Sequence, residues 1–341
     1  MKKKPDTLII LSIVGLCTFS LFNLFGIAQS FFISQIVFIF AGFIAFLIAR
    51  RVGIDFFRIN AGLTYAIFIG LLILTYITGD VVRGSRRWID FGIFNFQPSE
   101  FLKPFFAIYM ADLFSRRKID AATLIKSGSL FFIIFLIILK QPDLGSALLY
   151  LGVYMGMIFF AGLSLRYFVS GALFFAISSP VLWNSLKTYQ KQRVLSFIDP
   201  SHDISGAAYN VIQSVITVGS GGLVGRGLGL GTQSRFLFLP ENHTDFAFAS
   251  LIEQFGFVGG VAIIGLYCVL LYRLLLIVRD RKKESFYYLY TVGVMLFITI
   301  SVIVNMGMNM GIFPVTGITL PFISYGGSSV VSTMILIGLA L

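Results

Sequence analysis

Three ionisable side chains gather in the segment FLPENHTDFAF, residues 238–248, where a long apolar run begins. Glu241, His243 and Asp245 fall within five positions, although only 12% of the chain is charged. A carboxylate at the N-terminus of a helix tends to stay ionised, because the positive end of the helix dipole stabilises it. Asp245 could therefore accept a proton from a hydroxyl group as a general base. Thr244 or Asp245 could equally be the N-cap of the helix, and the two roles are compatible.

A second charged pair lies in FQPSEFLKP. Glu100 and Lys103 are three positions apart, so they share one face of a helix that begins near Pro98. The pair could satisfy itself, or Lys103 could face a carboxylate such as Asp245 or Asp143. In KQPDLGS, Asp143 opens another expected helix, where it could also act as an N-cap.

Glycine and proline interrupt the apolar pattern in two places. The run GSGGLVGRGLGLGTQS, residues 219–234, lacks the spacing of a nucleotide-binding loop and predicts a bent loop with exposed N–H groups. The segment 311–329, GIFPVTGITLPFISYGGSS, predicts non-helical backbone that lines a cavity. Between them, Glu253 is expected to be a structural acid that needs a partner.

The composition is that of an all-α polytopic membrane protein. The chain has 341 residues, is 57% hydrophobic and has a mean hydropathy of +0.91. Cys17 and Cys268 both lie in apolar runs, which argues against a disulfide framework. Two histidines, His202 and His243, are too few for a polyhistidine metal centre. In a membrane protein, a net charge of +11 favours basic cytoplasmic loops, and a site for any anionic lipid substrate, over a nucleic-acid partner.

Membrane-spanning helices need roughly 20 mostly apolar residues each. A single domain, 1–341, is expected, with one long loop at about 186–245 and no tandem repeat. The N-terminal apolar stretch is longer than a signal-peptide core, so it predicts a retained first span. The ten expected spans are 8–28, 31–49, 60–78, 99–115, 123–139, 144–163, 166–185, 246–277, 287–308 and 324–341.

The distribution of Lys and Arg favours a cytoplasmic N-terminus. That orientation leaves several basic residues on the outer face: Arg83, Arg86, Arg87, Lys140, Lys187, Lys191, Arg193, Arg226 and Arg235. An external anionic ligand would explain them, although Arg86 and Arg87 could instead reach lipid headgroups. The same face carries Asp80, Asp90, Glu100, Asp143, Asp199, Asp203, Glu241 and Asp245. This mixture of charges predicts a polar, water-accessible cleft.

Five stretches in order resemble the SEDS family of bacterial cell-wall proteins, which includes RodA and FtsW. They are GSRRWIDFGIFNFQPSEFLK, KQPDLGSA, NVIQSVITVGSGGLVGRG, FLPENHTDFAFA and PVTGITLPFISYGGSS, and they span residues 84–329. The segments YQKQRVLSFIDP, 189–200, and GTQS, 231–234, are more similar to RodA than to FtsW.

The resemblance implies a multi-pass protein of the bacterial cytoplasmic membrane with ten transmembrane helices. It implies a peptidoglycan glycosyltransferase that polymerises lipid II for cell elongation and shape, with a class B penicillin-binding protein as partner and a divalent cation, Mg²⁺ or Mn²⁺. The family's essential aspartate falls on Asp245, and its other functional residues fall on Glu100, Lys103 and Asp143. Glu241 and His243 are expected to shape the mouth of the site, with Asp245 and Glu241 as candidate metal ligands.

The expected reaction is an inverting transfer in which Asp245 activates the C4 hydroxyl of the acceptor sugar. Undecaprenyl pyrophosphate would leave, its charge neutralised by basic residues and a metal ion. The candidates are Arg86, Arg87, Arg193 and Arg226. Two alternatives remain open. A lipid II flippase would place its charges near the bilayer midplane, often on inverted repeats. A non-catalytic scaffold would leave the external carboxylates unexplained.

Overall fold

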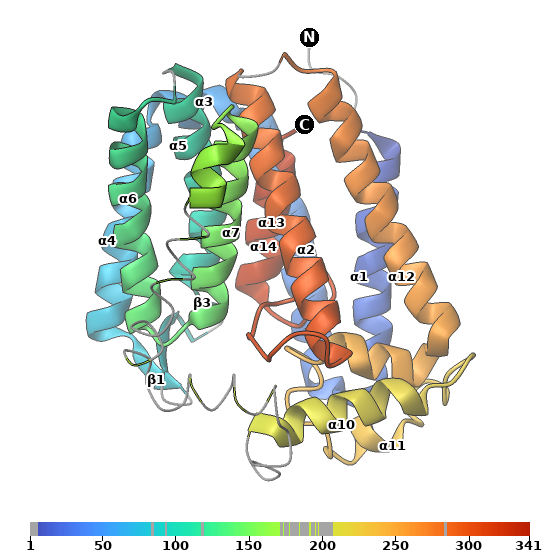
Figure 1. The fold of residues 1–341 in the computed structure, drawn as a ribbon. Coiled ribbons are helices and arrows are strands. Elements are labelled where there is room, and N and C mark those ends of the chain that lie inside the picture. The colour runs from blue at the N-terminus through green and yellow to red at the C-terminus, as the bar shows by residue number, and fades with distance from the viewer. Residues whose placement is uncertain are drawn as a thin grey trace.

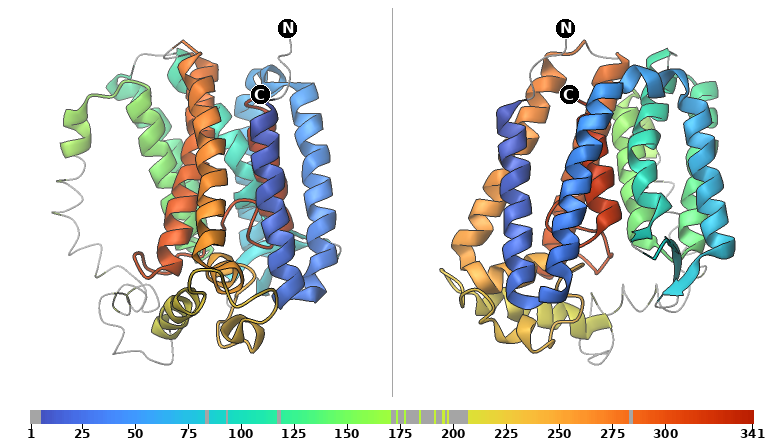
Figure 2. Two further views of the ribbon diagram at one scale, coloured as in Figure 1. Left: turned by 90° about the vertical axis from the view of Figure 1, so that its right-hand side faces the viewer. Right: turned by 180° about the vertical axis from the view of Figure 1, so that it is seen from behind.

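A computed structural model describes residues 6–82, 85–92, 94–116, 119–170, 207–282 and 285–341, with isolated positions between 171 and 206. Its helices form one bundle, and the chain begins and ends at the same end of that bundle (Figures 1 and 2). Arg193 and most of the expected span 166–185 lie outside the described residues.

Long helices make up the body of the bundle, which confirms the all-α prediction. They are α1 (Thr7–Ile27), α2 (Gln29–Val52), α4 (Ala61–Thr78), α5 (Pro98–Arg116), α6 (Ala121–Lys140), α7 (Leu144–Phe160), α12 (Ala247–Arg279), α13 (Phe286–Asn309) and α14 (Gly327–Gly338). Within the described residues, six of these are long and apolar enough to cross a membrane: α1, α2, α4, α6, α12 and α13. The predicted number of ten spans is therefore not confirmed.

Short elements gather at the end of the bundle opposite the termini, which we call the loop end (Figure 1). A three-stranded antiparallel sheet lies there, formed by β1 (Asp80–Val82), β2 (Ser85–Asp90) and β3 (Asn95–Phe96). The helices α10 (Ala207–Ser220) and α11 (Thr232–Arg235) lie there too, while α3 (Ile54–Ile59) connects α2 to α4.

Helix α10 corrects the prediction that 186–245 is a loop throughout. Its sequence, AAYNVIQSVITVGS, places Ser214 and Thr217 on a buried face, and Ala208 near the beginning of the helix is buried as well. Ser214 and Thr217 are three residues apart, which is the spacing of one helical face. The helix packs against α12 and α13 on that face. A search for apolar windows of about 20 residues misses such a helix because it has only 14 residues and mixes polar with apolar positions.

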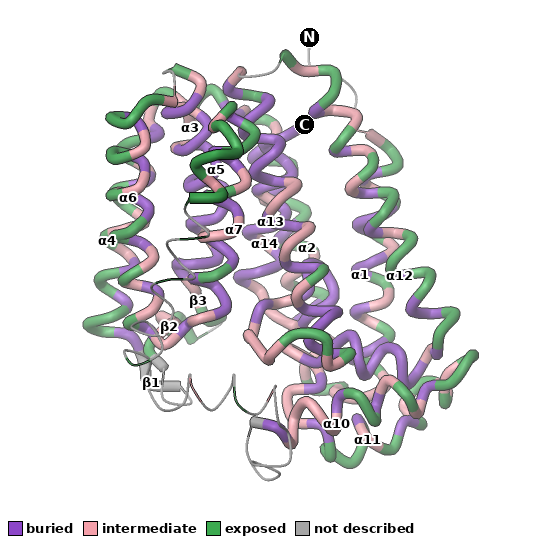
Figure 3. The backbone as a smooth tube through the Cα atoms, in the orientation of Figure 1, coloured by how far each residue is buried: buried purple, intermediate pink, exposed green. Residues whose placement is uncertain are grey.

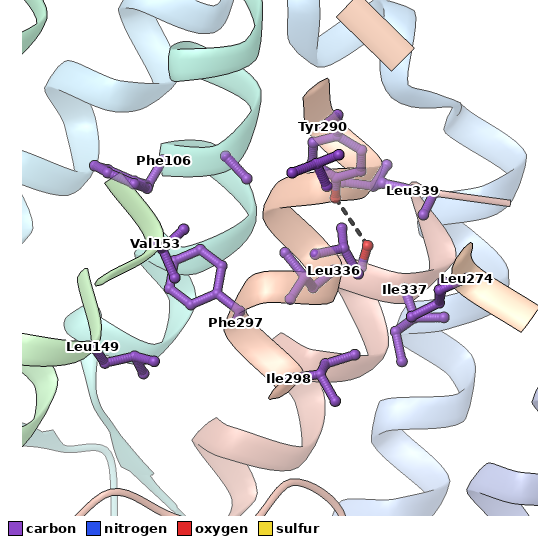
Figure 4. Packing of buried hydrophobic residues seen from close by; sticks show 14 of the residues in the cluster. Phe106, Leu149, Val153, Leu274, Tyr290, Phe297, Ile298, Leu336, Ile337 and Leu339 are labelled. Atoms are coloured by element: carbon purple, nitrogen blue, oxygen red, sulfur yellow. Dashed lines mark hydrogen bonds between the residues drawn. The ribbon is translucent and has the colours of Figure 1, made fainter. Parts of the chain in front are cut away.

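The core of the bundle is built around α13, which packs against α5, α7 and α12. Figure 4 shows Phe297 of α13 beside Val153 of α7 and Phe106 of α5, all within the buried cluster. The rings of Phe106 and Phe297 meet nearly at right angles, with their centroids 6.2 Å apart. Buried residues line the inner faces of the helices, while exposed ones cover the outer faces of α4, α6 and α12 (Figure 3).

Polar side chains connect helices inside this apolar core. The Tyr290 hydroxyl donates to the carbonyl of Leu336 at 2.9 Å, which joins α13 to α14 (Figure 4). The Tyr150 hydroxyl donates to the carbonyl of Ser99 at 2.6 Å and so joins α7 to α5. Within a bilayer, burial of apolar surface does not drive helices together, so close packing and such bonds of about 0.6 kcal/mol each hold the bundle.

Helix α12 is interrupted near its beginning, and the glycine-rich run fills the interruption. Gly256 has φ 67° and ψ −166°, a conformation that other residues rarely adopt. Four backbone hydrogen bonds join the two segments: Phe257 N to Gly222 O (2.9 Å), Val258 N to Leu223 O (3.1 Å), Arg226 N to Glu253 O (2.8 Å) and Gly227 N to Gln254 O (3.1 Å). The bent loop expected at 219–234 thus satisfies backbone groups that the interrupted helix leaves free.

A pair of glycine substitutions tests this close approach. Gly225→Ala would place a Cβ atom 2.1 Å from the carbonyl oxygen of Gln254, whereas Gly222→Ala meets nothing within 4 Å. Both glycines have positive φ, so both variants carry a backbone cost of roughly 1–2 kcal/mol. Only Gly225→Ala adds a collision with the α12 backbone. We therefore expect a clearly larger fall in the thermal unfolding temperature for Gly225→Ala; equal falls would contradict the proposed packing.

Candidate functional site

A tight turn, residues 241–246, leads into α12 and carries Asp245. The amides of Thr244 and Phe246 both donate to the carbonyl of Glu241, each at 3.1 Å. Helix α12 begins at Ala247 with Phe246 as its N-cap, so the expectation that Thr244 or Asp245 is the N-cap is wrong.

The first turn of α12 receives its cap from another helix. The side-chain oxygen of Asn309, at the end of α13, accepts the amide hydrogen of Ala249 at 2.9 Å. Sequence reasoning sought the cap in the preceding residues, where it usually lies. A neighbouring helix supplies the acceptor here because α12 and α13 pack together at the loop end.

Three consecutive carbonyl groups of this turn are held by the C-terminal part of the chain. The His243 carbonyl accepts from the Tyr325 amide at 2.9 Å, and the Thr244 carbonyl accepts from the Ser324 hydroxyl at 2.7 Å. The Asp245 carbonyl accepts from two side-chain amides, Asn305 at 3.1 Å and Asn309 at 3.0 Å. The segment 311–329, expected to line a cavity, thus packs directly against the turn that carries Asp245.

The Asp245 carboxylate is half-buried beside this C-terminal segment. A Cβ atom built on Gly317 would lie 3.7 Å from its Oδ2 atom, so the backbone of Gly317 borders the carboxylate. Gly317 has φ 76°. The absence of a side chain at this position therefore serves both the backbone conformation and the space beside the carboxylate.

The sequence reasoning did not single out Asn305 and Asn309. Both lie on α13 with no exposed surface. Two asparagines four residues apart in an apolar span are a detectable signal, because polar residues within membrane spans usually have a specific partner.

Glu241 and His243 shape the same turn. Glu241 has φ 53°, and its carboxylate accepts a hydrogen bond from the Thr244 hydroxyl at 2.9 Å. The imidazole of His243 stacks on Phe31 with ring centroids 4.6 Å apart, and it also lies near Tyr325. These contacts give the turn its shape, and a role of both residues at the mouth of a substrate site stays a prediction.

Glu100 and Lys103 form an ion pair within α5, as their spacing predicts. The Lys103 ammonium lies 2.6 Å from Glu100 Oε2, and each side chain is only 7% exposed. The hydroxyl of Ser332, on α14, donates to the same Glu100 oxygen at 3.4 Å. The structure thus pairs Lys103 with Glu100. The sequence also allowed Lys103 to face Asp245 or Asp143.

Asp143 is the N-cap of α7, as predicted, and it also has a cationic neighbour. Its carboxylate accepts from the amide and the hydroxyl of Ser146 at 3.0 and 2.9 Å. The Arg87 guanidinium lies 3.6 Å from Asp143 Oδ2 and donates to the carbonyls of Gln141 and Pro142. Arg87 therefore ties β2 to the beginning of α7, a role that sequence reasoning did not consider.

The other predicted basic side chains that the structure describes, Arg86 and Arg226, are exposed to solvent. Arg86 neighbours Arg87 on β2 and is exposed, and adjacent strand residues point to opposite faces of a sheet. Arg226 is exposed in the glycine-rich run, where its Nε donates to the carbonyl of Ser220 at 2.8 Å. Arg193 lies outside the described residues. Anion binding by these side chains stays a prediction.

Glu253 has the partners that its burial demands. Its carboxylate accepts from the amides of Gln233 and Ser234 at 2.8 and 3.0 Å, and from the Ser234 hydroxyl at 2.6 Å. These groups belong to the first turn of α11, so a buried acid of α12 binds the N-terminal end of that short helix. The expectation of a structural acid is confirmed.

The predicted ligands of a divalent cation are two carboxylates, those of Asp245 and Glu241. Within the described part of the chain, no group of three or more His, Cys, Asp or Glu side chains could hold a metal ion. Mg²⁺ is usually bound through one or two carboxylates together with waters and substrate phosphates. Asp245 and Glu241, carried by one turn, are a donor set of this kind, and cation binding by them stays a prediction.

The loop end therefore carries the Asp245 carboxylate, which is suited to proton transfer, and the buried ion pair of Glu100 and Lys103. It also carries Asp143, which caps α7 and lies beside Arg87. The turn of residues 241–246 and the beginnings of α5 and α7 all lie at this end (Figures 1 and 2). Asp245 borders a glycine of a non-helical segment. A half-buried carboxylate on a held backbone suits abstraction of a proton from a hydroxyl group of a bound substrate.

Comparison with known proteins gives consistent matches over the whole chain. The family model FTSW_RODA_SPOVE, described as "Cell cycle protein", matches residues 6–341. The peptidoglycan glycosyltransferase MrdB of Escherichia coli strain K12 is 41% identical over 274 residues, which cover 79% of this chain and 74% of that protein. Stage V sporulation protein E of Bacillus subtilis is 35% identical over 364 residues, covering 100% of this chain and 97% of that protein.

Two solved structures are similar over nearly their full length. One comes from work on the structural coordination of polymerization and crosslinking by a peptidoglycan synthase complex; it has a TM-score of 0.87 and 29% identity, and covers 98% of this chain and 96% of that chain. The rod shape determining protein RodA of Thermus thermophilus has a TM-score of 0.74 and 26% identity, covering 98% and 95% of the two chains.

Proposed function

The chain belongs to the SEDS family of FtsW, RodA and SpoVE cell-cycle proteins, and from this premise we propose that it polymerises lipid II at the outer face of the bacterial cytoplasmic membrane. It is a RodA-like peptidoglycan glycosyltransferase of cell-wall synthesis. The proposal adds the substrate, the membrane face and the use of the product in cell elongation and shape.

One observation carries the assignment of the site. Asp245 lies half-buried at the loop end, and its own carbonyl and the two preceding ones are held by α13 and the segment 318–325. A general base must be held within hydrogen-bond reach of the proton that it removes. A backbone fixed on both sides of the carboxylate supports that role better than a freely moving loop would.

We assign the reaction steps as follows. Asp245 takes the proton from the C4 hydroxyl of the acceptor sugar as that oxygen attacks the anomeric carbon of the lipid-linked donor. The new glycosidic bond forms as the bond to undecaprenyl pyrophosphate breaks, and the pyrophosphate leaves with both electrons of that bond. An α-linked donor and a β-1,4 product require inversion at the anomeric carbon, which a single direct displacement provides.

Charge on the leaving pyrophosphate has to be balanced at the same end of the bundle. Arg86 is exposed beside the Arg87–Asp143 tie, so it can reach a phosphate that approaches β2. When bound, a divalent cation neutralises phosphate charge as a Lewis acid. Asp245 and Glu241 are the residues that would hold it.

The proposal includes the molecules that this protein binds and its orientation in the membrane. We propose lipid II as the substrate, a class B penicillin-binding protein as the protein partner, and a cytoplasmic N-terminus. The similarity to a protein from a peptidoglycan synthase complex supports assembly into such a complex.

Purified protein reconstituted with fluorescent lipid II tests the proposal. With Mg²⁺ or Mn²⁺ and the class B partner present, we expect a ladder of glycan strands on a gel, lost on chelation and restored by adding the cation. Movement of lipid II between leaflets without strands would favour a flippase. No strands until a separate glycosyltransferase is added would favour a scaffold.

A further inference from the structure

Two buried asparagines of α13 contact the backbone of Asp245 without any part in the reaction described above. Asn305 and Asn309 lie four residues apart, one helical turn, and neither has exposed surface. Both side-chain nitrogens donate to the same atom, the Asp245 carbonyl oxygen, at 3.1 and 3.0 Å. A carbonyl oxygen accepts two hydrogen bonds, so this pair occupies both of its lone pairs.

The remaining polar atoms of the two amides are also engaged. The Asn305 nitrogen donates a second bond to the Ile318 carbonyl at 2.7 Å, and the Asn309 nitrogen donates to the Asn305 carbonyl at 2.8 Å. The Asn309 oxygen accepts from the Ala249 amide at 2.9 Å. Each nitrogen faces carbonyls and the Asn309 oxygen faces an N–H group, so only one orientation of that amide satisfies all of its contacts.

These contacts connect the backbone of Asp245 to two neighbouring segments. Asn305 bridges the carbonyls of Asp245 and Ile318, and Ile318 follows Gly317, whose backbone borders Asp245 Oδ2. Asn309 bridges Asp245 and the first turn of α12. The peptide group that follows the Asp245 Cα atom therefore cannot rotate without breaking two hydrogen bonds.

We propose that Asn305 and Asn309 are positioning residues. By donating hydrogen bonds to both lone pairs of the Asp245 carbonyl oxygen, they fix the backbone of Asp245 and so the direction of its carboxylate. The inference rests on the proposed role of Asp245. A displacement of about 1 Å at a reacting group can lower a rate by about 100-fold, so loss of this hold should reduce turnover more than substrate binding.

Leucine replacements test the proposal, because leucine resembles asparagine in shape and lacks its donors. Each single variant, Asn305→Leu or Asn309→Leu, leaves one hydrogen bond on the Asp245 carbonyl, and the double variant leaves none. We expect kcat to fall about 3- to 10-fold in each single variant and by more than the product of the two in the double variant, because residues that share a partner are not additive. The KM for lipid II should stay within about twofold of the native value, because the hydrogen bonds to the Asp245 carbonyl affect turnover and not substrate binding.

Asn23→Leu is the matched control. Asn23 is another buried asparagine, and its side chain joins α1 to α12 through Ala247, Ser250 and Gln254, which all follow the turn of residues 241–246. It should lower the unfolding temperature by a similar amount and keep a native kcat. Native kcat in the double variant, or kcat that falls in proportion to stability in all three positions, would overturn the proposal.

The single variants, hydrogen exchange and the Asp245→Asn variant provide further tests. If the double variant does not accumulate, native kcat in both single variants overturns the proposal. Hydrogen exchange of the amides in 243–249 should rise in the α13 variants and stay unchanged in Asn23→Leu. A native rate for Asp245→Asn would instead refute the role of Asp245 itself, so the two failures are distinguishable.

Discussion

Asp245→Asn should abolish most glycan polymerisation while leaving the protein folded. The amide has nearly the shape of the carboxylate but cannot take a proton from the acceptor hydroxyl, and loss of a general base lowers rates by about 10²- to 10⁴-fold. The backbone bonds of the turn come from Asn305, Asn309 and Ser324, and none of them needs the carboxylate.

The measurement is strand formation from lipid II per molecule of purified protein, together with the unfolding temperature. Asp245→Glu serves as a comparison because it keeps the charge but moves the oxygens by about one methylene, roughly 1.5 Å; such misplacement also lowers the rate. We expect Asp245→Asn to be the slower of the two. If Asp245→Asn polymerised lipid II at the native rate, Asp245 would not be the base.

Lys103→Met should be among the most destabilising single changes at the loop end. Lys103 and Glu100 are each 7% exposed, with 2.6 Å between the ammonium nitrogen and the carboxylate oxygen. Removing one partner leaves a buried charge uncompensated, which typically costs about 3–5 kcal/mol. Replacing both partners by uncharged residues of similar size removes that penalty. The double variant Glu100→Gln/Lys103→Met should therefore recover most of the lost stability.

Comparing stability with activity separates the two roles of this pair. We expect the double variant to unfold near the native temperature but to polymerise lipid II slowly, because the predicted functional role of Glu100 and Lys103 needs both charges. If activity returned together with stability, the ion pair would be structural alone. Arg58→Met is a suitable control, since Arg58 pairs with Asp112 at 3.0 Å in a more exposed setting, with 31% of the arginine side chain accessible. Its stability loss should be near the 0–1 kcal/mol of surface pairs.

Hydropathy predicts the positions of helices well where a helix crosses the bundle as one regular piece. The expected spans 8–28 and 60–78 correspond to α1, Thr7–Ile27, and α4, Ala61–Thr78. Average hydropathy does not predict an interruption of a helix that depends on the backbone dihedral angles of one residue. Nothing in an average over residues distinguishes Gly256, which interrupts α12, from the helical glycine at 265.

Local polar elements were also missed. The strand SRRWID, β2, pairs through its backbone with β1 and β3, and its charged residues hide any apolar alternation. Helix α10 has 14 residues, fewer than a membrane span needs, so a hydropathy search leaves it within the loop.

The sequence identifies individual residues of the candidate site but not the contacts between them. The spacing of Glu100 and Lys103 predicts their ion pair because the two residues share a helix. The partners of Asp245 and Thr244 come from positions 60 to 80 residues later in the chain. No local pattern connects such positions, and the predicted helix cap failed for the same reason: its acceptor belongs to α13.

The three held carbonyls have a consequence for how the protein is made. The Ser324 hydroxyl, which holds the carbonyl of Thr244, is synthesised 80 residues after it. At bacterial elongation rates of about 5–20 residues per second, that interval lasts roughly 4–16 s. During it, the nascent chain already contains Asp245 while the groups that hold its backbone are still missing. The site is therefore completed only late in translation, and a chain that stops before residue 324 carries the aspartate without its geometry.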